Sequence, residues 1–149
     1  MPRKPRSDST SEAVKAATAL PVHPPSTVPL EDCDKAFFAN VVDEFARSEW
    51  TAHSLELAAM LARTMADLER EQRELRKEGS IMASEKGTPV VNPRKTVIQM
   101  HASTILSYRR SLQLHARAHG EARDKAKRTR DAKVAEGAPN TDGLLARPN

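Results

Sequence analysis

Apolar residues recur with helical spacing in three segments of the chain, which short polar connectors separate. The first segment opens with acidic residues at 31–34, which suit a helix N-terminus because carboxylates there cap free amide groups and interact favourably with the helix dipole. We predict a helix that starts near Leu30 and ends near Arg47, with Trp50 in the turn that follows. Its apolar stripe consists of Phe37, Phe38, Val41, Val42 and Phe45.

The second and third segments both carry the spacing of a heptad repeat, three and four residues in alternation. Thr51 is a suitable N-cap for the second helix, which continues to Glu78 with Gly79 as its C-cap. The inner positions of this helix are Ala58, Leu61, Met65, Leu68, Gln72 and Leu75.

The third helix begins at Asn92-Pro93, where Asn92 is the cap and proline takes the first helical position, and it ends at Gly120. Its inner positions are Ile98, His101, Ile105, Tyr108, Leu112 and His115. Two long helices with matching stripes and a short connector predict an antiparallel helical hairpin.

The connector between these helices is predicted to form a small β-hairpin. Its strands are Ser80–Ser84 and Pro89–Val91, around the turn Glu85-Lys86-Gly87. A two-stranded hairpin is not stable by itself in water, so this one needs a neighbour, such as the same hairpin of another subunit.

The pattern also leaves apolar residues without a partner in the helical hairpin. Val97, Leu106 and Leu114 lie off its inner positions, and the first helix could cover them, or another subunit could. The chain has 149 residues and only 3% aromatic residues, a composition that often leads to self-association. We predict an oligomerisation surface that consists of Ile81, Val90, Val91, Val97, Leu106 and Leu114.

These patterns predict a mainly α fold in three parts. Residues 1–29 are rich in Pro, Ser and Thr and are expected to form a disordered arm. Residues 30–119 form the helical oligomerisation domain. Residues 120–149 form a basic, largely flexible tail, whose first part could continue as a polar helix.

Charge is distributed unevenly along the chain. Residues 31–92 carry a net charge of −5, whereas residues 93–133 carry +8. Such asymmetry is typical of proteins that bind nucleic acid, because a cluster of cations releases counterions from several phosphates. The predicted DNA-binding residues are Arg109, Arg110, Arg117, Arg123, Lys125, Lys127, Arg128, Arg130 and Lys133.

Two other interpretations of the charged segments remain. The basic segment could simply keep the chain in solution. The first two helices could form a helix-turn-helix, but the second of them opens without Arg or Lys before Arg63 and so lacks the usual contacts to phosphates and bases. No aromatic residues alternate with the cations, which disfavours stacking on single-stranded bases.

No motif for catalysis is present in the sequence. The five glycines are too scattered for a phosphate-binding loop, so we expect no enzymatic activity and no cofactor. Cys33 has no histidine near it in the sequence and is expected to be a spectator. His115 and His119 have the spacing of two metal ligands on a helix, but two ligands do not make a site, so no metal is expected.

We expect neither a membrane-spanning segment nor a signal peptide. Cys33 is the only cysteine in the sequence, which fits a reducing cytoplasm.

The layout of these elements resembles the small terminase subunits of tailed double-stranded-DNA phages. The resemblance covers residues 31–130: the Trp50-Thr51 junction, the long charged helix ending in Gly79, the hairpin with Gly87, the Asn92-Pro93 helix start and SLQLHARAHGEARDKAKR. Many members carry a Leu-Gly-Leu-(Thr)-Pro segment after the last helix. Here the matching stretch, which begins Leu112-Gln113-Leu114, has neither the Gly nor the Pro.

The resemblance implies a ring of about eight to ten copies that binds viral double-stranded DNA and hands it to the large terminase subunit, in the cytoplasm of the host cell. The large subunit would carry the ATPase and the nuclease, so this chain would not be an enzyme. A purely structural alternative is a helical adaptor whose basic tail binds an acidic protein.

Overall fold

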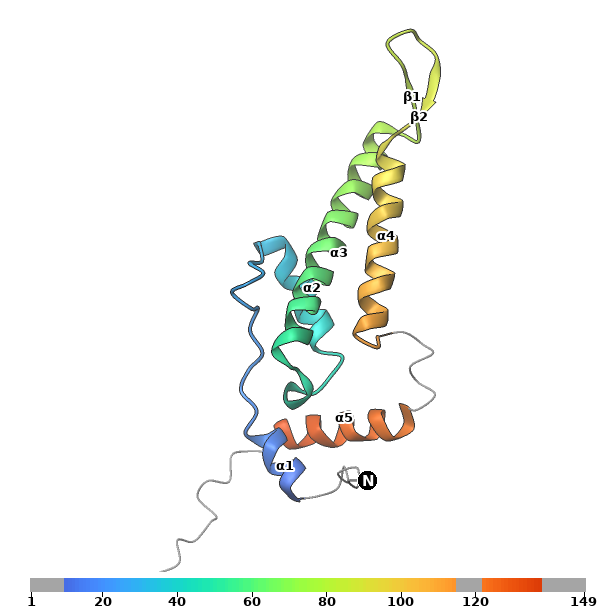
Figure 1. The fold of residues 1–149 in the computed structure, drawn as a ribbon. Coiled ribbons are helices and arrows are strands. Elements are labelled where there is room, and N and C mark those ends of the chain that lie inside the picture. The colour runs from blue at the N-terminus through green and yellow to red at the C-terminus, as the bar shows by residue number, and fades with distance from the viewer. Residues whose placement is uncertain (1–9, 115–121, 138–149) are drawn as a thin grey trace, which may run out of the picture. The chain divides into compact units, whose positions relative to one another are not determined.

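The computed structural model of the chain describes residues 10–114 and 122–137. It is mainly helical, as predicted, and divides into two compact units (Figure 1). The larger unit consists of residues 24–42 and 51–115, and the smaller unit of residues 1–23, 43–50 and 116–149.

Three helices form the body of the larger unit: α2 (Asp32–Val42), α3 (Ala52–Glu78) and α4 (Arg94–Ser111). Helices α3 and α4 lie side by side and run in opposite directions, and α2 packs against the first half of α3 (Figure 1). The predicted antiparallel helical hairpin is therefore confirmed.

The core of this unit lies where α2 and α4 pack on α3. The predicted inner positions Leu61, Ile105 and Leu112 are buried, whereas Gln72 is exposed near the far end of α3. Side chains of α2 and small side chains of α3 complete the core: Phe38, Val41, Ala58, Ala59, Ala62 and Ala66. Burying a large apolar side chain contributes about 1.5–3 kcal/mol, and the alanines allow the helices to approach closely.

Both predicted ends of α3 are confirmed. The Thr51 hydroxyl accepts a hydrogen bond from the Ser54 amide at 3.2 Å, which caps the first turn. Gly79 ends the helix with φ 86°, a conformation that residues with a side chain rarely adopt.

The first predicted helix is shorter than expected. It ends at Val42 rather than near Arg47, and a 3₁₀ turn, η1 (Arg47–Glu49), follows. The turn has its own cap, because the Glu49 carboxylate accepts a hydrogen bond from the Ala46 amide at 3.0 Å. Phe45 leaves the helical stripe and contacts Trp50 edge to face, with ring centroids 5.5 Å apart.

The third predicted helix is also shorter, because α4 ends at Ser111 and not at Gly120. Gln113 has φ 58°, and its amide donates to the Arg110 carbonyl at 3.0 Å. The Leu114 amide donates to the Arg109 carbonyl at 2.8 Å. This pair of hydrogen bonds is the Schellman motif, which satisfies the last carbonyls of a helix and turns the chain away.

The predicted β-hairpin is present at the end of the helical hairpin (Figure 1). Strands β1 (Ile81–Ala83) and β2 (Pro89–Val91) are antiparallel, with Ile81 opposite Val91 and Met82 opposite Val90. Gly87 allows the tight turn through its φ of 78°.

The smaller unit contains α1 (Thr10–Ala17) and α5 (Ala122–Glu136), which contact each other and η1. Helix α1 lies within the segment that was expected to be a disordered arm. Its sequence TSEAVKAA is rich in alanine, the best helix former, and Ala16 is buried. Helix α5 is the polar helix that the sequence allowed at the start of the basic tail.

Candidate nucleic-acid and assembly surfaces

The predicted DNA-binding residues are divided between the two units. Arg109 and Arg110 are exposed in the last turn of α4, in the larger unit. Arg117 lies outside the described residues. The other six belong to α5, in the smaller unit: Arg123, Lys125, Lys127, Arg128, Arg130 and Lys133.

Helix α5 does not present all its cations to solvent in the same way. Lys127 and Arg130 are exposed. Lys133 is half-buried and donates hydrogen bonds to the backbone carbonyl of Asp43 and, at 3.2 Å, to its carboxylate. Lys133 is therefore engaged within the chain, which differs from the expectation of a free phosphate contact.

Most of the predicted oligomerisation residues are exposed within the single chain. Ile81 and Val91 of the β-hairpin are each 66% exposed, and Leu106 of α4 is 56% exposed. Val90 and Val97 are also exposed, and Leu114 is half-buried. The alternative that the first helix covers Val97 and Leu106 is wrong, because α2 packs on α3 and leaves both exposed.

The exposed apolar residues of α4 lie on two sides of the helix. Val97 and Leu106 are nine positions apart, which places them about 180° apart around a helix with 3.6 residues per turn. Met100, three positions after Val97, is on the Val97 side and is 63% exposed. We call these two surfaces the Val97 side and the Leu106 side of α4. One contact with one partner could not cover both.

A buried asparagine connects the β-hairpin to the helices. Asn92 is 1% exposed, and its backbone amide donates to the Ser80 carbonyl at 3.1 Å. Its side-chain amide donates to the Gly79 carbonyl and the Glu78 carboxylate, and its side-chain oxygen accepts from the Arg94 amide. Asn92 thus caps α4, as predicted, and also fixes the end of α3.

Arg94 joins the same junction through ion pairs. Its guanidinium donates two hydrogen bonds to Glu78, at 3.0 and 2.7 Å, and one to Glu71. The hydrogen bonds from Arg94, and then that from Asn92, lower the pKa of Glu78 to about 2. The same carboxylates raise the pKa of Arg94, which stays charged at any physiological pH. The base of the β-hairpin is therefore held by a charged, fully hydrogen-bonded junction.

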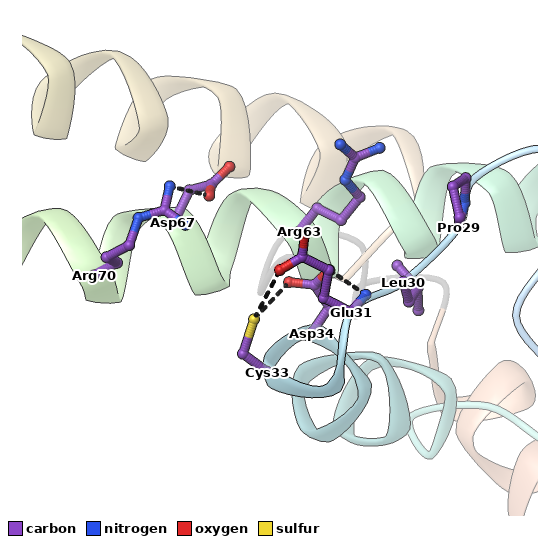
Figure 2. Close-up of a pocket in the computed structure, with 8 residues that line it drawn as sticks. All are labelled: Pro29, Leu30, Glu31, Cys33, Asp34, Arg63, Asp67 and Arg70. Atoms are coloured by element: carbon purple, nitrogen blue, oxygen red, sulfur yellow. Dashed lines mark hydrogen bonds and ion pairs between the residues drawn. The ribbon is translucent and has the colours of Figure 1, made fainter.

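A cavity of about 280 Å³ lies between the start of α2 and the middle of α3 (Figure 2). Figure 2 shows the Cys33 thiol directed at the carboxylates of Glu31 and Asp34. Asp34 is buried and accepts a hydrogen bond from the Glu31 amide at 2.9 Å, which makes it part of the α2 cap. On the α3 side, Arg70 forms an ion pair with Asp67 at 2.6 Å.

The thiol in this cavity is not activated. Desolvation and the hydrogen bond to Asp34 raise the pKa of Cys33, whereas a nucleophilic cysteine needs a lowered pKa. The carboxylates Asp34 and Asp67 are occupied by capping and pairing. The arrangement supports helix packing.

Within residues 10–114 and 122–137, no three His, Cys, Asp or Glu side chains are grouped so that they could hold a metal ion. The predicted histidine pair, His115 and His119, lies outside the described residues. No helix in the described ranges is long and apolar enough to cross a membrane.

Two sets of contacts in the structure have no counterpart in the sequence pattern. One is the junction of Arg94 with Glu71 and Glu78, and the other joins α5 to the η1 turn. In both, the partners are far apart in the chain, so no local spacing could reveal them. The only available signal was the abundance of opposite charges at the ends of the helices.

The chain is similar to known proteins over its whole length. The model of the Hendrixvirinae small terminase family matches residues 1–149. A curated relative, the terminase small subunit of Enterobacteria phage HK97, is 33% identical over 153 residues, which cover 96% of this chain and 94% of that protein.

Proposed function

Because the chain belongs to the Hendrixvirinae small terminase family of phage DNA-packaging proteins, we propose that it forms a homo-oligomeric ring of about eight to ten copies. The ring binds double-stranded viral DNA and delivers it to the large terminase subunit in the host cytoplasm. The large subunit supplies the ATPase and nuclease activities, and this chain acts without catalysis of its own.

The observation that carries the proposal is the pair of apolar sides on α4. A two-fold dimer uses the same patch on both subunits and would leave the other side in water. A ring uses two different patches on each subunit, one for each neighbour. The Val97 side and the Leu106 side fit that requirement, and the β-hairpin adds Ile81 and Val91, both largely exposed, beyond the end of α4.

The DNA-binding part of the proposal rests on charge. Arg109 and Arg110 are exposed at the end of α4, and Lys127 and Arg130 are exposed on α5. These cations are suited to phosphate contacts, which are independent of base sequence and sensitive to salt.

Light scattering at low and high salt, without DNA, tests the assembly. A single closed species of many subunits at both salt concentrations is expected, because the contacts that we propose are apolar. A monomer or dimer at both would contradict the ring.

DNA binding is tested by replacing five residues of α5 with alanine: Arg123, Lys125, Lys127, Arg128 and Arg130. The variant should bind duplex DNA more weakly and with a shallower dependence on salt, at an unchanged oligomer size. Unchanged affinity would move the DNA-binding surface away from α5.

One contact favours the second candidate function, a helical adaptor that binds an acidic protein partner. Lys133 of α5 already binds an acidic residue, Asp43, within the chain. An adaptor would bind an acidic polypeptide more tightly than DNA of equal charge at the same salt concentration, which direct competition measures.

A further inference from the structure

Helix α5 has two different sides. Thr129, Lys133 and Glu136 follow one another at intervals of four and three positions, so they lie on one side of the helix, which we call the docking face. Lys127 and Arg130 are exposed, and Val134 is 72% exposed. Among the α5 side chains that the structure describes, the docking face makes the polar contacts to the segment that contains η1.

Each residue of the docking face has a polar partner in that segment. The Thr129 hydroxyl donates to the Glu49 carboxylate at 2.9 Å, and Lys133 donates to Asp43. Glu136 has a side chain that is only 12% exposed, and it accepts a hydrogen bond from the Arg47 amide. The docking face therefore binds by hydrogen bonds and ion pairs.

Little apolar surface supports this contact. Among the described residues of the smaller unit, the buried apolar side chains are those of Ala16 and Ala46. The Asp43 side chain is 87% exposed, so its ion pair with Lys133 is screened by water and salt. An exposed ion pair of this kind is one that a competing anion can replace.

We propose that the docking of α5 is an autoinhibitory contact that DNA phosphate displaces. The proposal rests on the DNA binding proposed above. Docked α5 offers Lys127 and Arg130 to DNA while Asp43 occupies Lys133. Undocked α5 gains Lys133 as a phosphate contact and moves away from the carboxylates of Asp43 and Glu49. Because the undocked helix binds a polyanion better, DNA shifts the equilibrium toward it.

The chain contains its own reporter for this change. Trp50 is its one tryptophan and directly follows η1, the turn on which α5 docks. The experiment compares Asp43→Asn with Glu44→Gln, which removes the same charge from the next residue. Glu44 is exposed and has no ion pair or hydrogen bond within the part of the chain that the structure describes.

Without DNA, Asp43→Asn should increase amide hydrogen exchange in α5 and shift the Trp50 emission, whereas Glu44→Gln should do neither. Titration of the wild type with labelled duplex DNA should produce the same Trp50 shift. Asp43→Asn should also bind the duplex about two- to fivefold more tightly than Glu44→Gln, the range expected for one exposed ion pair.

Two results would overturn the inference: α5 exchange that is unchanged in Asp43→Asn, or DNA binding by the wild type without any change at Trp50. Failure of the proposed function gives a different result, a wild type that binds no duplex at low salt. The exchange measurement without DNA separates these cases, because it reports docking alone.

Discussion

Gln113 occupies a backbone conformation that glycine adopts without strain. Its φ of 58° is required for the Schellman motif that ends α4. A left-handed residue with a side chain costs about 1–2 kcal/mol.

We therefore expect Gln113→Gly to raise the free energy of unfolding by about 0.5–1 kcal/mol. Gln113→Val should lower it by about 1–2 kcal/mol, because a β-branched side chain tolerates this conformation least. Urea denaturation measures both. A valine variant as stable as the glycine variant would show that the backbone at this position differs from that described.

Glu78 predicts a pH dependence of the junction below the β-hairpin. Its pKa is lowered from 4.5 to about 2 in the folded chain by Arg94 and Asn92. The contribution of the Glu78 carboxylate to the free energy of unfolding is therefore complete above pH 4.5 and is lost as the pH falls toward 2. In Glu78→Gln this part of the acid sensitivity should disappear. Urea denaturation of both proteins between pH 6 and pH 2, roughly the titration range of carboxylates, measures the difference. Equal pH profiles for both proteins would contradict the assigned contacts.

Asn92 gives a further prediction at the same junction. Asn92→Ala removes three side-chain hydrogen bonds from a buried position. The free energy of unfolding should fall by about 1–3 kcal/mol. Exchange of the β-hairpin amides should increase more than that of the α3 amides, and uniform exchange across both would argue against a local role.

Residues that act locally were predictable from the sequence, and residues that act across the fold were not. Thr51 and Gly79 have their roles within a few positions of the chain, as does Asn92 in capping α4, so their residue types reveal these roles. Arg94 and Glu78 are separated by the whole β-hairpin. Their pairing depends on how the connector folds back, which no spacing rule supplies.

At the scale of elements, periodicity predicted the long helices and their contact but misjudged where helices end. The first helix stops at Val42 because Ala46 and Glu49 form a separate capped turn. Helix α1 was missed because proline-rich flanks surround a short alanine-rich segment in which Ala16 is the one buried side chain among those that the structure describes. A short helix of this kind depends on tertiary contacts, here with α5.

Ile105 tests the contact between α3 and α4. It is 9% exposed, so Ile105→Asp would bury a charge without a partner and should cost more than about 3 kcal/mol, enough to unfold the unit. Thermal unfolding followed by far-ultraviolet circular dichroism measures the effect. A folded variant with an unchanged melting temperature would mean that Ile105 does not face α3.

At the scale of the whole molecule, the sequence predicted which apolar residues lie outside the helical hairpin. It did not predict which cations pair with carboxylates of the same chain. Val97 and Leu106 were expected to lie outside the helical hairpin, and they are exposed. Lys133 was grouped with the other cations because charge along a chain carries no information about pairing. Only the fold shows that Asp43 engages Lys133.

The two sides of α4 allow a test that distinguishes a ring from a two-fold dimer. Val97→Asp and Leu106→Asp should each leave the chain folded, because both residues are exposed. Each should disrupt every interface of a ring, in which the Val97 side of one copy meets the Leu106 side of the next. Each variant alone is therefore expected to be a monomer by light scattering. An equimolar mixture should form a dimer and no larger species, because each variant retains the side that the other lacks.

In a two-fold dimer built on one patch, one variant would still assemble, and mixing the two variants would not increase the mass. The mass of the mixture therefore decides between the two assemblies, and circular dichroism of each variant confirms that the helices are intact.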